Sequence, residues 1–288
     1  MLYPEITRLP FTRAILGEAF VPGPPDAERL DEPGFWLLLH GNDLLTTRAA
    51  DGRPGLPYGP APAPPVWEVA PVWIGTLDGK PVRAARLPAS APIPDQLVPM
   101  AAGMRHRDLD DRMLSLAGLA RQILHWRDRS RICPACGGRP VGIPHTYGVR
   151  CTACGREYFP HVHPAIIVLV RRGDEFLLVR KPYWPAGQYG LVAGYVEFGE
   201  SLEECVLREV MEETGVRVAN PRYLVSQAWP YPTQLMAGFE AEYVSGDIVV
   251  DTTELEHAAW FRPDRLPPSL SPAGSTARYL IDTYALGK

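Results

Sequence analysis

The chain has 288 residues, of which 46% are hydrophobic and 22% are charged, and its formal net charge is −4. This length can bury two hydrophobic cores, whereas the negative charge and a sequence pI near 6.0 argue against a strong general affinity for polyanions. No apolar run is long enough to cross a membrane, and the N-terminus does not resemble a secretory signal. We therefore expect a cytoplasmic protein that does not use a membrane.

The first part of the chain predicts a small β-rich domain. Three apolar runs have the character of strands: Phe35–His40, Val66–Ile74 and Val82–Leu87. The proline-dense segment Pro54–Pro65 is expected to be an exposed loop. Apolar residues then recur at helical spacing over Asp108–Asp128. We expect an N-terminal domain of mixed, β-rich structure over residues 1–127.

Two Cys-x-x-Cys pairs, fourteen residues apart, follow this helix. Such pairs suit tetrahedral Zn²⁺ bound through four thiolates, with no position left for catalysis. The four ligands would be Cys133, Cys136, Cys151 and Cys154. A redox role is the alternative, but two pairs together favour a structural zinc. We expect a zinc ribbon over residues 128–160; the arginines beside it are most simply a solvated helix face, and an RNA-contacting patch is the alternative.

From residue 161 onward, strands and helices are mixed. Apolar runs at Ile166–Val170 and Glu175–Val179 flank a Gly-Asp turn, which predicts a hairpin. Further strands are expected at residues 191–193, 223–226 and 236–243, and a last helix at residues 275–285. An acidic helix is predicted between them, because Ser201 and Glu204 have the spacing of a capping box and Gly215 suits a helix C-terminus.

Three carboxylates lie at i, i+3 and i+4 of this acidic helix. Glu209, Glu212 and Glu213 would therefore share one helix face, where like charges repel. A hard cation such as Mg²⁺ or Mn²⁺ resolves the conflict, because it prefers oxygen ligands. A solvated acidic face is the simpler alternative, but it does not account for the other residues around the three glutamates.

Those residues form a pattern that resembles the Nudix box, and the chain therefore resembles a Nudix hydrolase. The matching positions are Gly194, Glu200, Arg208, Glu209, Glu212, Glu213 and Gly215. The resemblance implies an α/β fold, an α/β/α sandwich over residues 161–288. It also implies that Glu209, Glu212, Glu213 and the Ala193 carbonyl are metal ligands, and that Arg208 and Glu200 orient the acidic side chains.

A second motif narrows the resemblance to the NADH pyrophosphatase branch of that family. It is an aromatic-proline array, in which rings held on a stiff backbone can stack on a base. The array comprises Gln227, Ala228, Trp229, Pro230, Tyr231, Pro232, Thr233 and Gln234. Ala228, Tyr231 and Gln234 depart from the family's proline, phenylalanine and serine. An ordinary proline-rich loop is the alternative interpretation.

The resemblance implies further site residues. Phe159, which takes the place of a family tyrosine, is expected to stack on nicotinamide or adenine, and Tyr195 lies where the family also has an aromatic residue. Ala277 corresponds to a substrate contact, and Glu254 to a glutamate that acts as a metal ligand or base. Glu256 lies close enough to compete with Glu254 for that role. Each position could instead be a core aromatic or part of an acidic surface turn.

The function implied is metal-dependent hydrolysis of the diphosphate of NADH, with NAD⁺ also accepted, to AMP and nicotinamide mononucleotide. Removal of the NAD cap from RNA 5′ ends is the leading alternative substrate. A broader hydrolysis of ADP-ribose and other nucleoside diphosphate derivatives, and a non-catalytic nucleotide sensor, are the remaining alternatives. The family further implies a homodimer.

Overall fold

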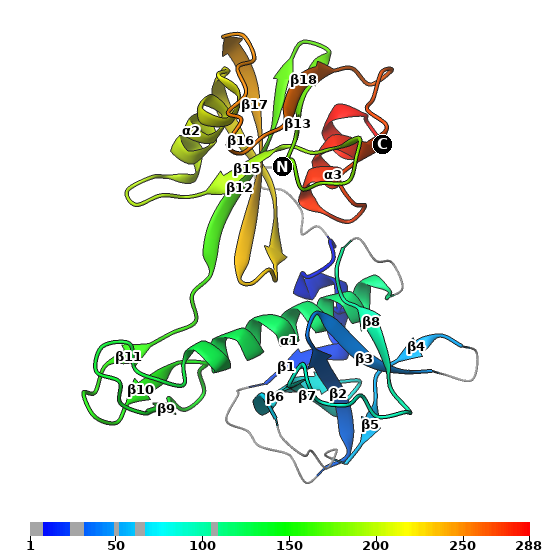
Figure 1. Ribbon diagram of the computed structural model, residues 1–288, viewed down its shortest axis with the longest axis vertical. Coiled ribbons are helices and arrows are strands. Elements are labelled where there is room, and N and C mark those ends of the chain that lie inside the picture. Colours follow the sequence, from blue (N-terminus) through cyan, green and yellow to red (C-terminus); the bar gives the residue numbers. More distant parts are fainter. Residues whose placement is uncertain (1–7, 24–31, 49–51, 61–66, 105–108) are drawn as a thin grey trace. The chain divides into compact units, whose positions relative to one another are not determined.

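A computed structural model describes residues 8–23, 32–48, 52–60, 67–104 and 109–288 of the chain (Figure 1). These residues form two compact units. One unit contains Pro10–His161 and the short segment Pro230–Thr233. The other contains Val162–Trp229 and Gln234–Lys288, with the described end of the N-terminal segment. Among the described residues, no helix is both long and apolar enough to span a bilayer.

The first unit contains an eight-stranded sheet with the order β1-β6-β7-β2-β3-β4, to which β5 and β8 are added on β2 and β3. β2 and β7 are parallel, and the other pairs are antiparallel. Two 3-10 turns, Arg13–Ile15 and Gly17–Ala19, precede it. The strands are β1 (Phe20–Pro22), β2 (Gly34–His40), β3 (Asp43–Arg48), β4 (Pro54–Gly55), β5 (Tyr58–Gly59), β6 (Val69–Leu77), β7 (Lys80–Leu87) and β8 (Val98–Ala101).

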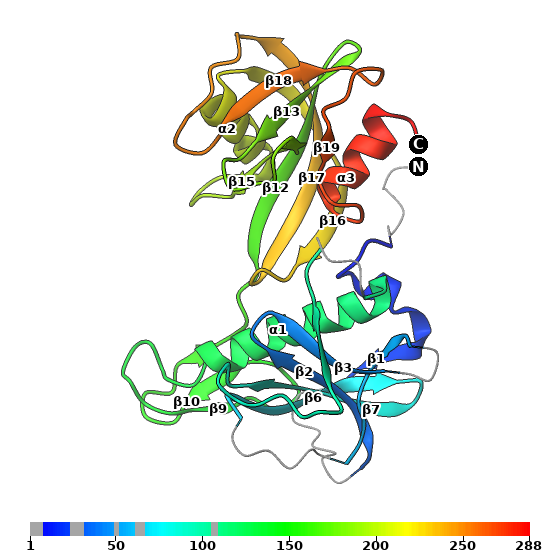
Figure 2. The same ribbon diagram turned by 45° about the vertical axis from the view of Figure 1, so that its right-hand side comes forward.

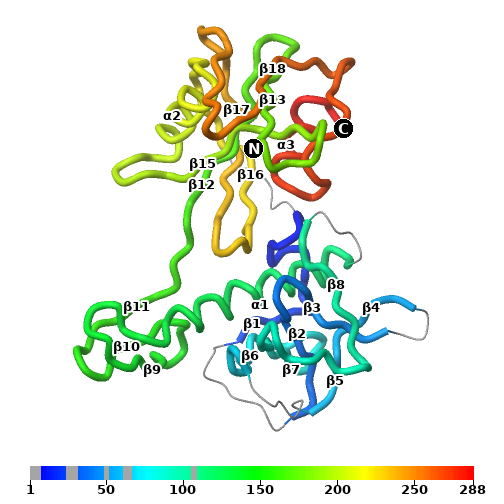
Figure 3. Tube along the Cα trace, in the orientation of Figure 1, coloured from blue at the N-terminus to red at the C-terminus, as the bar shows by residue number. Residues whose placement is uncertain are grey.

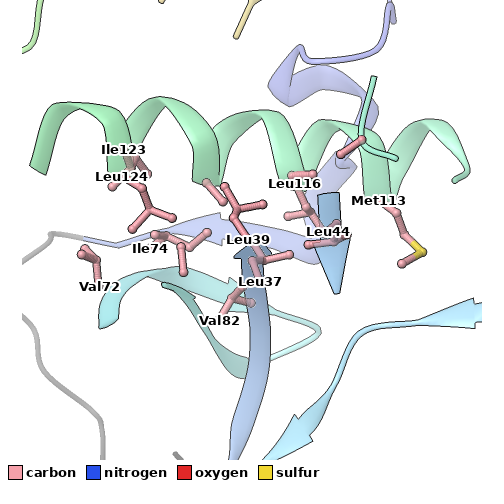
Figure 4. Packing of buried hydrophobic residues seen from close by; sticks show 14 of the residues in the cluster. Leu37, Leu39, Leu44, Val72, Ile74, Val82, Met113, Leu116, Ile123 and Leu124 are labelled. Carbon is pink, nitrogen blue, oxygen red and sulfur yellow. The ribbon is translucent and has the colours of Figure 1, made fainter. Parts of the chain in front are cut away.

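A long helix, α1 (Asp111–Arg129), packs across this sheet (Figure 4). The Asp110 side chain caps its N-terminus by accepting a hydrogen bond from the Met113 amide at 2.7 Å. One face of α1 buries Leu116 and Leu124 against Leu37 and the strands around it. The helix begins three residues later than expected, and the expected first residue, Asp108, lies outside the described residues.

The cysteine-rich segment follows α1 in the same unit. It forms a three-stranded antiparallel sheet, β11-β10-β9. The strands are β9 (Pro140–Gly142), β10 (Val149–Cys151) and β11 (Glu157–Tyr158). Each of these strands is only two or three residues long.

The second unit is built on a six-stranded mixed sheet of order β16-β17-β12-β13-β18, with β15 paired to β12. β12 and β17 are parallel and central, and β16 and β17 form a long antiparallel hairpin (Figure 3). A small pair, β14 and β19, lies outside the sheet. The strands are β12 (His163–Arg172), β13 (Glu175–Arg180), β14 (Gln188–Tyr189), β15 (Val192–Tyr195), β16 (Arg217–Trp229), β17 (Gln234–Ser245), β18 (His257–Phe261) and β19 (Ser269–Leu270).

Helices cover both faces of this sheet, which makes the expected α/β/α sandwich (Figure 2). α2 (Leu202–Thr214) packs on one face through Val206 and Val210. α3 (Thr276–Leu280) and the π-helical turn Ile281–Ala285 cover the other. Because both faces of the sheet are covered, β12 is continuously apolar and buried from Ala165 to Val170.

Most strand predictions agree with the structure, but the proline-dense segment does not. Pro54–Gly55 and Tyr58–Gly59 are short strands paired to β3 and β2, so the expectation of an exposed loop is wrong there. A proline is tolerated in such edge strands because its missing N–H is not needed by the sheet. Residues 61–65 of that segment, and Val66 of the second expected strand, lie outside the described residues.

Candidate active site

The acidic helix α2 has well-defined ends. Ser201 accepts a hydrogen bond from the Glu204 amide, and the Glu204 carboxylate accepts one from the Ser201 amide, so the capping box is complete. Gly215 ends the helix in a left-handed conformation with φ of 70°. These ends fix which residues face the sheet. Glu209 and Glu213 are buried, with exposed fractions of 8% and 2%, whereas the Glu212 side chain is exposed.

Glu209 lies directly against the backbone of β15. A Cβ atom placed on Gly194 would lie 1.9 Å from the Glu209 carboxylate, so only glycine fits there. Ala193, whose carbonyl is the expected metal ligand, is the preceding residue of the same strand. The structure thus brings the part of the box on β15 into contact with the part on α2. Burial raises the pKa of Glu209, although Arg208 opposes this effect.

Arg208 connects the glutamates of the box. Its guanidinium donates to Glu200 at 2.5 and 2.9 Å, and its Nη1 donates to Glu209 and Glu212 at 2.9 Å each. Nη2 also donates to the Tyr195 carbonyl at 2.9 Å. The hydrogen bonds that Glu200 accepts from Arg208 lower the pKa of Glu200 to about 2 and raise the pKa of Arg208. A planar guanidinium can hold several carboxylates at once, and it therefore fixes their geometry.

Glu213 is the most deeply buried carboxylate of the cluster. Burial raises its pKa to about 7, against the opposing effect of Lys181, whose Nζ donates to Glu213 Oε1 at 3.2 Å. The other oxygen, Oε2, is buried and has no hydrogen-bond partner among the described residues. An orphaned buried carboxylate oxygen is costly, and a cation ligated there would satisfy it.

Glu254 reaches the same cluster from the loop before β18. The Asp251 amide donates to the Glu213 carbonyl at 3.1 Å, which ties this loop to the end of α2. Lys181 Nζ lies 3.5 Å from Glu254 Oε2, whereas Glu256 pairs with Arg180 at 3.0 Å. The geometry therefore puts Glu254, not Glu256, beside Glu213.

Lys181 was missed by the sequence analysis. It follows β13 directly and lies 32 residues before Glu213, so no local spacing connects the two. Although burial opposes its charge, the neighbouring Glu213 raises the pKa of Lys181 overall. Its rarity is the one feature of the sequence that could have drawn attention to it, because the chain has lysine only at Lys80, Lys181 and Lys288.

The aromatic-proline array begins at the end of β16. Gln227 is fully buried, and its amide donates to the Gly274 carbonyl and accepts from the Thr276 amide, each at 2.9 Å. These bonds hold the start of α3, where Ala277 is buried. Gln227 thus supports the position of Ala277. Ala228 and Trp229 follow on β16, and Trp229 is paired with Gln234 in the hairpin ladder.

Tyr195 and Gln234 meet at one end of the six-stranded sheet, where β15 ends and β17 begins. Tyr195 is half-exposed at the end of β15, and its hydroxyl accepts a hydrogen bond from the Gln234 side chain. β15 and β17 both pair with β12, which explains how residues 39 apart in sequence meet. An exposed ring next to Gly194 in the sequence, at the end of β15, can contact a bound base.

The tip of the array, Pro230–Thr233, belongs to the other unit. The Tyr231 ring packs edge-on against Phe11 with centroids 5.8 Å apart, and its hydroxyl donates to the Ala102 carbonyl at 2.9 Å. The Arg121 guanidinium lies 5.0 Å from the ring centroid, and burial raises the pKa of Tyr231. Thr233 is buried. Tyr231 is therefore anchored within its unit.

Two further features of that unit concern ligands. Pro230, Tyr231 and Pro232 line a cavity of about 530 Å³ together with Arg86 and Arg121. Phe159, the other expected stacking residue, is 48% exposed and covers Gly148, where a Cβ atom would meet its ring at 2.7 Å. An exposed ring fixed on a glycine is suited to stacking.

The four expected zinc ligands lie together. Their Sγ atoms are within 4.8 Å of one another; Cys133 and Cys154 are 3.8 Å apart, and Cys136 and Cys151 are 3.5 Å apart. Tetrahedral Zn²⁺ with Zn–S bonds of about 2.3 Å requires sulfur atoms about 3.8 Å apart, so the cluster fits that ion. A hydrogen bond with Tyr158 lowers the pKa of Cys133 to about 6, which favours the thiolate.

Cys205 is distinct from this cluster. It is fully buried on α2, and burial raises the pKa of its thiol to about 12. Its Sγ atom donates to the Tyr195 carbonyl at 3.3 Å. A thiol with this environment is unreactive and fills space.

Comparisons with known proteins agree with this architecture. A family model for the NUDIX domain matches residues 161–284, and one for the NADH pyrophosphatase-like rudimentary NUDIX domain matches residues 33–126. A protein of Pseudomonas aeruginosa strain LESB58 named NAD-capped RNA hydrolase NudC is 42% identical over 87% of this chain and 89% of its own length. The protein of that name from Pseudomonas fluorescens strain Pf0-1 is also 42% identical, over 88% of this chain and 91% of its own.

Among solved structures, a NUDIX hydrolase from Nitrosomonas europaea is similar with a TM-score of 0.45 and 19% identity, covering 55% of this chain and 94% of its own. The chain belongs to the Nudix hydrolase family. The rudimentary domain at residues 33–126 and the similar proteins place it in the NADH pyrophosphatase branch of that family.

Proposed function

We propose that the protein hydrolyses the diphosphate linkage of NADH and NAD⁺ to AMP and nicotinamide mononucleotide, reduced or oxidised. The observation that carries the proposal is the contact between Gly194 and Glu209 within a complete box of glutamates, in a chain whose relatives are named for hydrolysis of NAD caps. The diphosphate is common to the free dinucleotide and to that cap.

In this proposal Glu209, Glu212, Glu213, Glu254 and the Ala193 carbonyl bind Mg²⁺ or Mn²⁺. When bound, such ions neutralise phosphate charge and lower the pKa of water. The protein's own part is positional. Arg208 holds the carboxylates of Glu200, Glu209 and Glu212 in fixed positions, so their oxygens are preorganised before any ion binds. Tyr195 and Gln234 would hold one base of the dinucleotide, and Ala277 belongs to the same substrate-binding set.

The four cysteines, in the same proposal, hold a structural Zn²⁺, and Phe159 and Tyr231 belong to the substrate-binding set. We also propose that the chain divides at residues 160/161, forms a homodimer and works in the cytoplasm; the other expected boundary, at residues 127/128, lies within α1. Support for the location comes from the cysteines, because none of the five is in a disulfide and thiolate ligands persist in a reducing compartment.

NAD-capped RNA is the second candidate substrate. Its support is the name of the relatives and the cavity in which Arg86 and Arg121 lie beside the aromatic-proline tip, since guanidinium groups suit phosphates. An Arg86→Ala variant is the discriminating protein: it should weaken cleavage of capped RNA while leaving free NAD⁺ cleavage unchanged. Equal effects on both substrates would remove the support for an RNA site in this cavity.

The test of the main proposal is product analysis of NADH, NAD⁺, ADP-ribose and NAD-capped RNA incubated with zinc-loaded protein and Mg²⁺ or Mn²⁺. AMP and nicotinamide mononucleotide should form from NADH, and should be lost with Glu213→Gln or a chelator. Faster cleavage of ADP-ribose would favour the broader diphosphatase, and cleavage of none of the four by folded protein would leave the nucleotide sensor. Light scattering on the same sample tests the homodimer.

A further inference from the structure

Lys181 is placed where its ammonium contacts two glutamates from different elements. Its Nζ atom lies 3.2 Å from Glu213 Oε1 on α2 and 3.5 Å from Glu254 Oε2 on the loop before β18. The side chain is only 15% exposed, so this contact is held by its surroundings. In the metal-free protein, the lysine is therefore the cation that joins the two carboxylates.

Lysine is a rare residue in this chain, which otherwise uses arginine for its positive charges. The chain has 29 basic residues, and lysine occurs only at Lys80, Lys181 and Lys288. An ammonium is a compact point charge, whereas the planar guanidinium of arginine spreads its charge over a fork. Between two carboxylate oxygens an ammonium therefore resembles a metal ion more closely than a guanidinium does.

We propose that Lys181 is an internal counter-ion that holds Glu213 and Glu254 together without metal and must leave them when a divalent cation binds. The inference rests on the proposed metal site. It makes Lys181 a positioning residue with two effects: it keeps the glutamates in place in the metal-free protein, and it weakens the affinity for the ion by competing for the same oxygens. Glu213 Oε2, which has no hydrogen-bond partner in the part of the chain that the structure describes, is the oxygen at which the incoming ion first finds a free ligand.

The first experiment measures Mn²⁺ binding to full-length, zinc-loaded protein by calorimetry, and thermal unfolding with and without Mn²⁺. Lys181→Met keeps the length of the side chain and removes its charge, and Lys288→Met is the matched control at an exposed position. Lys181→Met should bind Mn²⁺ about tenfold more tightly, which is about 1.4 kcal/mol. It should also lower the Tm of the metal-free protein and leave that of the metal-bound protein unchanged.

A spectroscopic measurement follows the lysine itself. With only three lysines, side-chain NMR of protein labelled at lysine should resolve three Nζ or Cε signals, and Lys181→Arg assigns one of them. Addition of Mg²⁺ should shift that signal toward the position of a solvated lysine and leave the other two unchanged. A role confined to folding would not produce this shift.

The outcomes separate this inference from the proposed function. Unchanged or weaker Mn²⁺ binding by Lys181→Met, or a Lys181 signal that does not respond to Mg²⁺, would overturn the counter-ion role while the metal site stands. If Glu213→Gln binds Mn²⁺ as the unaltered protein does, the ion is not at this site, and the proposed function fails with it.

Discussion

At the scale of single residues, the site depends on one close approach. The Glu209 carboxylate occupies the space that any side chain at position 194 would need. Gly194→Ala should therefore displace Glu209 by about an ångström and reduce kcat/KM about 100-fold, with a smaller effect on stability. Steady-state kinetics on NADH, with Gly142→Ala as a control where a Cβ meets nothing within 4 Å, tests this. Equal activity of the two variants would contradict the role given to Gly194.

Glu213 gives a second prediction at this scale, for the metal-free protein. Its pKa is raised from 4.5 to about 7 on folding, so the folded state binds its proton more tightly than the unfolded state does. The free energy of unfolding should therefore fall as pH rises from about 4.5 to about 7, by roughly 3 kcal/mol at most.

Urea unfolding in a chelator that spares the zinc, at a series of pH values, measures this fall. Glu213→Gln has no proton to lose and should flatten the pH dependence in that window. Excess Mg²⁺ should do the same, because a bound cation favours the charged carboxylate. A fall of equal size in Glu213→Gln would assign it to another group.

At the scale of elements, we predict that the short strands β9, β10 and β11 depend on zinc held by the four cysteines around them. A Cβ atom on Gly138 would lie 3.0 Å from Cys151 Sγ and 3.2 Å from Cys136 Sγ, so the chain turns tightly around the cluster. Cys136→Ser should abolish zinc binding and leave residues 133–158 open to proteolysis. Zinc analysis by mass spectrometry and limited proteolysis measure both effects, and Cys205→Ser should retain its zinc.

The elements also show how far the sequence can predict the structure. The ends of α2 were predictable because Ser201, Glu204 and Gly215 act within one helix turn of their partners. The two short strands in the proline-dense segment were not, because their pairing with β2 and β3 involves residues distant in sequence. Lys181 was missed for the same physical reason: its partners Glu213 and Glu254 come from other elements.

At the scale of the whole molecule, the chain passes between its two units at Pro230–Thr233 as well as near residues 9 and 161. Tyr231→Phe removes the hydroxyl that donates to Ala102 and should lower the free energy of unfolding by about 1 kcal/mol. Tyr231→Ala also removes the ring that packs on Phe11 and Arg121, and should cost about 3–5 kcal/mol.

Urea unfolding followed by tryptophan fluorescence measures both variants. Tyr183→Phe, at a highly exposed tyrosine, is the control and should have the stability of the unaltered chain. If Tyr231→Ala is no less stable than this control, the ring is not an anchor of its unit.

The anchoring of Tyr231 bears on how this protein can evolve. Suppose that recombination exchanged residues 10–161 for those of a distant relative. The exchanged residues would then have to pack against a Tyr231 loop from the other parent, which is encoded seventy residues downstream. Viable chimeras should therefore carry Pro230–Thr233 from the same parent as residues 10–161. Residues 10–161 and the segment Pro230–Thr233 are then inherited together, although neither contains the glutamate box.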